Sequence, residues 1–222
     1  MDRNIILSLL AIILVVLAAA IFLPGGRSVD THPKLPWQID VSQGEVQVFG
    51  MHLGVTTLAE AQRLLNAEAE VTLFRSEAGQ LAAEAYFQRA SLSGLRADFI
   101  LSMAVDQETS AAMFERGLRI SKLGSGTRKV DLSAADRQQL LTSPVSHITY
   151  LPAADLDPEL IARQFGQPDE KISEAEGIEH WLYPHKGLDI AINPEGKEVL
   201  QYLQPRNFDR ATLPLRRLTE KP

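Results

Sequence analysis

The residues best suited to chemistry lie close together between positions 180 and 189. Four residues separate His180 from His185, and Asp189 follows, so a hairpin could gather three metal-ligating side chains. Strand alternation offers another interpretation, in which Trp181 and Tyr183 project from one face into a core or a partner groove, and His180 lies on the other face. We favour this interpretation, predict no metal site, and take Trp181 and Tyr183 as candidate partner-binding residues.

Charged side chains gather at two other places that could contact a partner. Eight acidic residues oppose two basic ones between Asp155 and Glu179, whereas the stretch 206–222 has five basic residues against two acidic ones. Surfaces of one charge attract partners of the other, and the basic stretch, which we expect to be a loosely packed terminus, could touch anionic lipid. The candidate partner-binding residues here are Glu174, Glu176, Arg216 and Arg217.

Several classes of function lack support in the sequence. The chain has no cysteine, which excludes thiolate metal sites, thiol nucleophiles and disulfide scaffolds. Its formal net charge of -6 repels nucleic acid. No local grouping indicates a nucleophilic site, and Leu123–Lys129 lacks the spacing of a phosphate loop, so we interpret it as a flexible connector. We predict no catalytic residue, no cofactor and no nucleic acid partner.

An uncharged run from Ile5 to Leu23 dominates the N-terminal region. Its 19 residues would form a helix of about 28 Å, close to the bilayer hydrocarbon thickness of about 30 Å. Arg3 and the small residues 18–20 also fit a cleaved signal peptide, but the apolar region of such peptides usually spans only about 7 to 15 residues. We predict a single-pass anchor or uncleaved signal, with the cleaved signal peptide as the alternative.

The charges that flank this run do not decide its orientation. Arg3 on one side faces Arg27 and Lys34 on the other, so the positive-inside rule gives no clear answer. A short N-terminal stub before a signal-like segment favours export of the long domain that follows. Assuming a bacterial source, we predict an inner-membrane protein whose body lies in the periplasm.

The rest of the chain alternates short helices with strands. Thr57 and Glu60 form a capping box for a helix ending near Asn66, and Asp157 caps a helix stopped by Gly166. Strand patterns of period two follow each helix, so we predict an α+β fold made of a tandem repeat of short helix plus antiparallel sheet. The predicted parts are an anchor at 1–26, a stalk at 27–36, a first α+β half at 37–132, a second at 133–205 and a basic tail at 206–222.

The second half resembles the small lipoprotein subunit of the outer-membrane barrel-assembly machinery and, more distantly, the tandem-repeat β-lactamase inhibitor protein. The resemblance is carried by DPELIARQFGQPDE, HWLYPHKGLDIAI and GKEVLQYL, which share the order short helix, Gly-x-Pro, hairpin. It implies a periplasmic protein that binds envelope proteins or lipid without an active site. The whole chain is also similar to a family of proteobacterial membrane-anchored proteins through LPWQI, VFGMHLG and HWLYPHKGLDIA, which implies no particular activity.

Three hypotheses of function remain after these observations. We favour a non-enzymatic, membrane-anchored module that binds an envelope protein on a concave sheet surface. The first alternative is a lipid or small-molecule binding protein of the envelope, and the second is a periplasmic hydrolase assembled from residues distant in the sequence. The oligomeric state does not follow from the sequence.

Overall fold

The computed structural model describes residues 33–124, 126–174 and 177–219. The chain divides into two compact units, 1–33 and 34–222, and the fold below is that of the second unit. The predicted membrane segment Ile5 to Leu23 and most of the predicted stalk therefore lie outside the described residues. Within the described ranges, no helix has the length and apolar character needed to cross a membrane.

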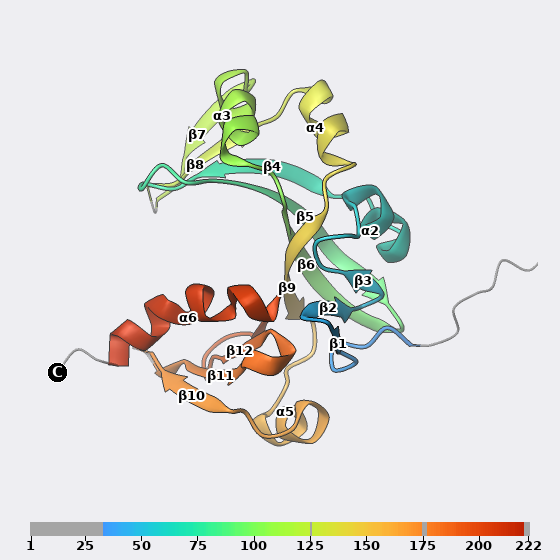
Figure 1. Cartoon of the computed structure of the whole chain (residues 1–222), viewed down its shortest axis with the longest axis vertical. Coiled ribbons are helices and arrows are strands. Elements are labelled where there is room, and N and C mark those ends of the chain that lie inside the picture. The colour runs from blue at the N-terminus through green and yellow to red at the C-terminus, as the bar shows by residue number, and fades with distance from the viewer. Residues whose placement is uncertain (1–32, 125, 175–176, 220–222) are drawn as a thin grey trace, which may run out of the picture. The chain divides into compact units, whose positions relative to one another are not determined.

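A ten-stranded antiparallel sheet dominates an α+β fold, as the sequence predicted (Figure 1). Its strand order is β10-β11-β12-β13-β9-β6-β5-β4-β8-β7, and a separate three-stranded sheet has the order β1-β2-β3. The strands are β1 (Asp40–Ser42), β2 (Glu45–Val48), β3 (Met51–His52), β4 (Glu70–Arg75), β5 (Leu81–Leu92), β6 (Leu95–Met103), β7 (Arg119–Lys122), β8 (Arg128–Asp131), β9 (Val145–Pro152), β10 (Glu170–Ser173), β11 (Glu179–Tyr183), β12 (Leu188–Ile192) and β13 (Val199–Leu203).

Side-chain caps set the starts of four of the helices. Thr57 and Glu60 form the predicted capping box, in which the Thr57 N–H donates to Glu60 Oε2 at 2.9 Å. Asp157 accepts from the Leu160 N–H at 2.7 Å, as predicted. The helices are α2 (Leu58–Leu65), α3 (Gln107–Glu115), α4 (Ala134–Leu140), α5 (Pro158–Phe165) and α6 (Pro205–Thr219), with a short 3-10 helix η2 (Pro184–Lys186).

One face of the large sheet carries the main hydrophobic core, to which α2, α3 and α5 contribute buried side chains. Phe49 lies at the centre of an aromatic cluster, with ring centroids 5.0 to 5.3 Å from those of Phe99, Tyr150 and Tyr202. These residues come from the β2–β3 turn and from strands β6, β9 and β13, so the cluster ties the small sheet to the middle of the large one. Aromatic pairs at this separation add to the stability that burial itself provides.

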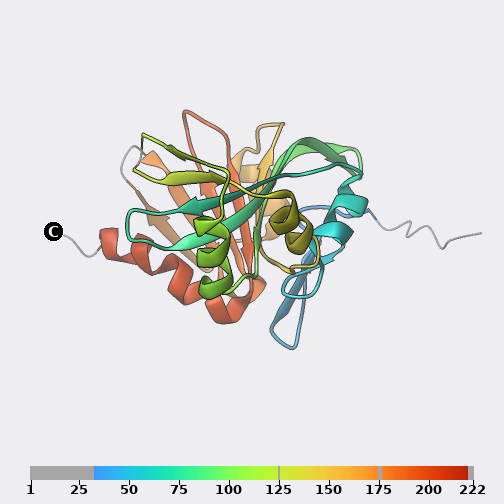
Figure 2. The same cartoon turned by 90° about the horizontal axis from the view of Figure 1, so that it is seen from above.

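The large sheet is strongly twisted, so that in Figure 2 the strands of the second half, in orange, cross the direction of the first-half strands, in green. A bulge contributes to this bend, because the β5–β6 register shifts between Phe87 and Ala90. Arg89 has a φ of 48° at the bulge, and its N–H donates to Asp98 Oδ1 at 2.7 Å. Figure 1 shows α6 inside the curve of the sheet and α2 and α5 outside it.

Two interpretations of the sequence are wrong. The expected flexible connector Leu123–Lys129 overlaps a strand, because Arg128 and Lys129 belong to β8 and Arg128 pairs with Lys122 on β7. The basic tail is not a loosely packed terminus either, because residues 205–219 form helix α6. Phe208 on α6 is 1% exposed and packs in a second hydrophobic cluster with Ile172, Leu182 and Leu203. The apolar side chains of the tail become a helix face only when the sheet offers them a surface.

We expect Phe208→Ala to lower the free energy of unfolding by about 3 to 5 kcal/mol, because it removes a large buried ring from the contact between α6 and the sheet. Urea denaturation of the full chain in neutral detergent measures this change. Leu213→Ala is the control, since Leu213 lies on the same helix and is 44% exposed. Equal stability of the two variants would show that α6 does not depend on this contact.

Candidate functional site

The sheet face that α6 shares, opposite the main core, is polar across its middle strands. Cross-strand register places Glu84 opposite Ser102 and Ser102 opposite His147, while Tyr86 lies opposite Ile100. Because side chains alternate along a strand, these residues share one face. We call the polar face the surface formed by Thr72, Glu84, Tyr86, Ile100, Ser102, His147, Thr149, Asp189 and Gln201.

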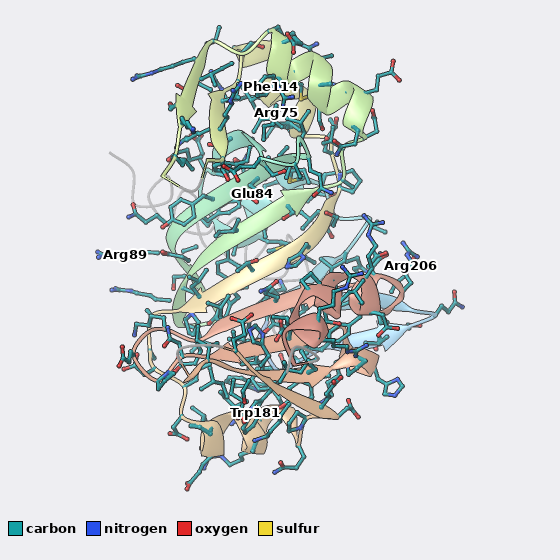
Figure 3. The ribbon with its side chains drawn as sticks, turned by 90° about the vertical axis from the view of Figure 1, so that its left-hand side faces the viewer. Arg75, Glu84, Arg89, Phe114, Trp181 and Arg206 are labelled. Atoms are coloured by element: carbon teal, nitrogen blue, oxygen red, sulfur yellow. The ribbon has the colours of Figure 1, made fainter. Side chains whose placement is uncertain are left out.

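Glu84 lies near the middle of this sheet in Figure 3 and lines a cavity of about 220 Å³. Within the described part of the chain, its half-buried carboxylate has no hydrogen bond or ion pair. Burial raises the pKa of Glu84, because desolvation disfavours the charged form. The basic side chain of the cavity lining, Lys129, is already paired, since its Nζ lies 2.8 Å from Glu70 Oε1. The cavity therefore holds a carboxylate that lacks a cation.

Tyr86 is held beside Glu84 by a hydrogen bond that also supports the β5 bulge. Its O–H donates to Asp98 Oδ2 at 2.8 Å, while Asp98 Oδ1 accepts the Arg89 N–H. The bond to Asp98 raises the pKa of Tyr86, so the phenol stays protonated. Arg89 itself extends at the edge of the sheet (Figure 3). The Asp98 carboxylate thus holds the Tyr86 side chain and also supports the bulge that bends the polar face.

A buried pair of titratable groups lies at the other end of the polar face. His180 Nδ1 is 2.9 Å from Asp189 Oδ1, and His180 Nε2 is 3.7 Å from Glu174 Oε1. Burial by itself lowers the pKa of His180, but the hydrogen bond to Asp189 and the charges of Asp189 and Glu174 outweigh it and raise the pKa. Burial lowers the pKa of His147 against the opposing charge of Asp189. The pKa of His180 is therefore higher than that of an ordinary histidine, and the pKa of His147 is lower.

The structure places the predicted aromatic residues in the core and not on a docking surface. Trp181 is 4% exposed and Tyr183 is 2% exposed, and the Tyr183 O–H donates to the Gly166 carbonyl at 3.0 Å. His180 lies on the opposite face of β11 and His185 lies in η2, as predicted. Both aromatic side chains point toward the apolar face because they alternate with His180 and Leu182. The structure thus assigns Trp181 and Tyr183 to core packing, in place of the predicted contact with a partner.

The predicted charged residues that the structure describes have different surroundings. Glu174 lies beside His180, whereas Glu176 lies outside the described residues. Arg216 pairs with Glu170 at 3.0 Å and with Asp209 at 3.2 Å, and Arg217 is exposed on α6. Arg216 therefore ties α6 to β10, which is a structural contact.

Reasoning from the sequence missed Glu84, Tyr86 and Asp98. The available signal was the alternation of Glu84 and Tyr86 with small apolar residues along β5, which indicates a strand with one polar face. That signal does not say whether the polar face meets solvent, a helix or a cavity. Only the register with β4 and β6 shows that Glu84 is partly desolvated.

A second cavity, of about 510 Å³, lies on the core side of the sheet near the start of β6 and the end of β9. Its walls are mostly apolar and include Trp37, Leu95, Tyr150 and Leu156. Burial raises the pKa of Tyr150 to about 12, so its phenol is a neutral hydrogen-bonding group. A cavity of this size and lining is typical of small-molecule sites.

Comparisons with protein-family models, curated proteins and solved structures found no match to this chain. The site is therefore interpreted from its own geometry. In the described ranges, no group of three or more histidine, aspartate or glutamate side chains is arranged to hold a metal ion. The described residues provide two features that could carry function. One is the Glu84 carboxylate, which has no paired cation, and the other is the buried pair of His180 and Asp189.

We expect Asp189→Asn to destabilise the fold more at about pH 6 than at about pH 9. A raised histidine pKa contributes stability that is complete below the pKa of the unfolded chain and is lost as pH rises through the folded pKa of His180. Urea denaturation at both pH values measures the change, and an NMR titration of His180 reports its pKa. Asp40→Asn, at an exposed position on β1, is the control. An equal loss at both pH values would contradict this account of the pair.

Proposed function

We propose that this protein is a non-enzymatic, membrane-anchored interaction module whose polar face binds an extended segment of an envelope protein. The observation that carries the proposal is the half-buried Glu84 carboxylate, which has no cation in the described residues. A basic side chain of the partner would enter the cavity and form a charge-assisted hydrogen bond with Glu84. Ile100 and Tyr86 beside it would contact the apolar part of that side chain.

Charge supports a basic partner. Glu84 and Asp98 lie on strands of the polar face, whereas Lys129, which lines the same cavity as Glu84, is paired with Glu70. The whole chain has a formal net charge of -6, which steers basic partners toward it at low salt. The cavity of about 220 Å³ beside Glu84 gives one basic side chain of such a segment a place to enter.

Anchoring and architecture complete the proposal. We infer from the apolar run Ile5 to Leu23 that the body is tethered to a bacterial inner membrane on its periplasmic side. We also infer that the fold arose by tandem duplication, because α2 precedes the meander β4–β6 and α5 precedes the meander β10–β13. The likeness of the second half to the barrel-assembly lipoprotein would then extend to a shared use, the binding of envelope proteins.

We expect Glu84→Gln to weaken partner binding by about tenfold, because a charge-assisted hydrogen bond is worth roughly 1.5 to 3 kcal/mol. A photo-crosslinking residue at Ile100 captures the partner in intact cells, and mass spectrometry identifies the captured peptide. Its contact residue should be lysine or arginine. Glu84→Lys should abolish capture, and replacing the basic residue of the partner by glutamate should restore it.

Glu159→Gln is the matched control for Glu84→Gln, since it removes the same charge from an exposed position on α5. Glu84→Gln should leave stability unchanged or higher, because it removes a desolvated charge. A periplasmic reporter fused to the C-terminus checks the side of the membrane. If the natural chain, Glu84→Gln and Glu84→Lys capture the partner equally well, the proposed mode of binding is refuted.

The second candidate function is binding of a lipid or small apolar molecule, which the cavity of about 510 Å³ favours. Trp37, which lines this cavity, lies a short distance along the chain from the predicted membrane segment. A ligand could therefore come from the bilayer. Leu156 is held at the cavity by its N–H, which donates to Glu198 Oε2 at 3.0 Å.

For this second function, we expect native mass spectrometry of the gently extracted full chain to show a retained ligand that Leu156→Trp displaces. The indole would fill part of the cavity of about 510 Å³ and exclude the ligand. Leu118→Trp is the control, because Leu118 is 71% exposed and lies away from this lining. A chain that never retains a ligand would count against this second function.

A further inference from the structure

Three basic residues stand in one row across the edge of the large sheet. Arg75 on β4 lies directly opposite Arg128 on β8, and Arg128 lies directly opposite Lys122 on β7. Residues paired in this way have Cβ atoms about 4.5 to 5.5 Å apart, and like charges at such positions destabilise a sheet. The fold therefore keeps an arrangement that costs stability when nothing of opposite charge is bound.

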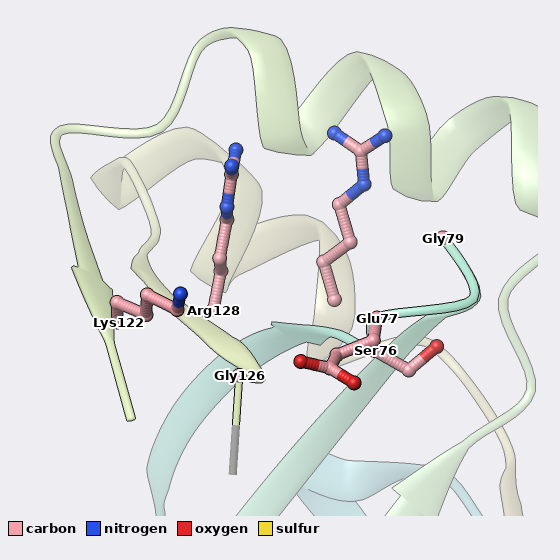
Figure 4. A pocket seen from close by; sticks show the side chains of 7 residues that line it. Ser76, Glu77, Gly79, Lys122, Gly126 and Arg128 are labelled. Carbon is pink, nitrogen blue, oxygen red and sulfur yellow. The ribbon is translucent and has the colours of Figure 1, made fainter. Parts of the chain in front are cut away.

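The three residues line a cavity of about 310 Å³, which Figure 4 shows from close by. The cavity lies between the β4–β5 turn, with Ser76 and Gly79, and the β7–β8 hairpin, with Gly126. In Figure 4 the Lys122 amine points toward Arg128. Gly79 has a φ of +82°, and no other atom lies within 4 Å of the place where a Cβ would be, so the turn is open on that side.

Protein carboxylates do not neutralise this row. Among the described residues, none of the three cations forms an ion pair with a carboxylate, and Glu77 is the one acidic residue of the lining. The Glu77 carboxylate lies against Gly126, where a Cβ would overlap it. The Arg75 guanidinium lies 5.0 Å from the centroid of the Phe114 ring, which orients it without neutralising its charge.

We propose that this cavity is an anion site for a phosphate-type oxyanion, either free phosphate or the phosphate of a phospholipid headgroup. Two guanidinium groups and one ammonium would donate to its oxygens, and Ser76 lies at the rim with a hydroxyl. Three cations against one carboxylate leave an excess of two positive charges, which is enough to balance either a phosphate ion or the singly charged phosphodiester of a headgroup. The site is separate from Glu84 and does not depend on the function proposed above.

The test uses the full chain in neutral detergent, titrated with inorganic phosphate at constant ionic strength. We expect saturable binding that raises the unfolding midpoint of the natural chain, and binding about tenfold weaker in Arg128→Gln. Arg119→Gln is the matched control, because it removes one positive charge from β7 without lining the cavity. Without phosphate, Arg128→Gln should unfold at the same temperature or higher, since repulsion is relieved.

A second arm identifies the source of the oxyanion. The full chain, with a photo-crosslinking residue at the exposed Gln80, is placed in nanodiscs of phosphatidylcholine with or without phosphatidylglycerol. Crosslinked phosphatidylglycerol that disappears in Arg128→Gln would assign a lipid headgroup, whereas phosphate binding alone would assign a soluble ligand. Failure of both ligands to bind, or equal binding by natural chain, Arg119→Gln and Arg128→Gln, would overturn the proposal. Partner capture through Glu84 should be unchanged in Arg128→Gln, which keeps the two proposals distinguishable.

Discussion

The rest of the structure depends on the two hydrogen-bonded ladders of β9, which pairs with β6 on one side and with β13 on the other. Without these ladders, the strands of the two halves would form separate sheets with exposed edges, which favour aggregation. The ladders also set the register of the central strands. Ile148 and Tyr150 enter the core, so His147 and Thr149 must lie on the polar face.

The two faces of the sheet consequently differ in what can cover them. The core face carries the aromatic cluster around Phe49, whose rings are buried at little cost because they are apolar and the Tyr202 hydroxyl donates to the Pro36 carbonyl. The polar face carries Glu84, His147 and other groups that are costly to bury without partners. Helix α6 packs on the part where Leu182 and Leu203 make that face apolar. Elsewhere the polar side chains are partly or wholly buried in the curve of the sheet, and a cavity of about 220 Å³ lies beside Glu84.

Two electrostatic features of the first half cost stability in the isolated chain. Glu84 is a desolvated carboxylate, and Arg75, Arg128 and Lys122 form a row of like charges. A basic group bound beside Glu84 would lower the first cost, and an acidic group bound beside the row of three basic residues would lower the second. Departures from local stability rules tend to mark functional sites in folded proteins. The pair His180 and Asp189 differs from both, because each group already satisfies the other.

The sequence by itself determined the short-range structure of this protein. Thr57 with Glu60 and Asp157 with Pro158 mark helix starts within a few residues, and alternating side chains mark the strands. Such signals depend on hydrogen bonds and side-chain spacing inside one segment. They were sufficient for the α+β class and for the positions of helices α2 and α5.

Only the tertiary structure decided what those elements face. Helix α6 needs a sheet surface for Phe208, Glu84 becomes desolvated only between β4 and β6, and Trp181 enters a core and not a docking surface. Such outcomes depend on contacts between residues far apart in the chain, such as the bond from the Tyr202 hydroxyl to the Pro36 carbonyl. Local propensities carry no information about such pairings, because the same strand pattern fits several neighbours until packing selects one.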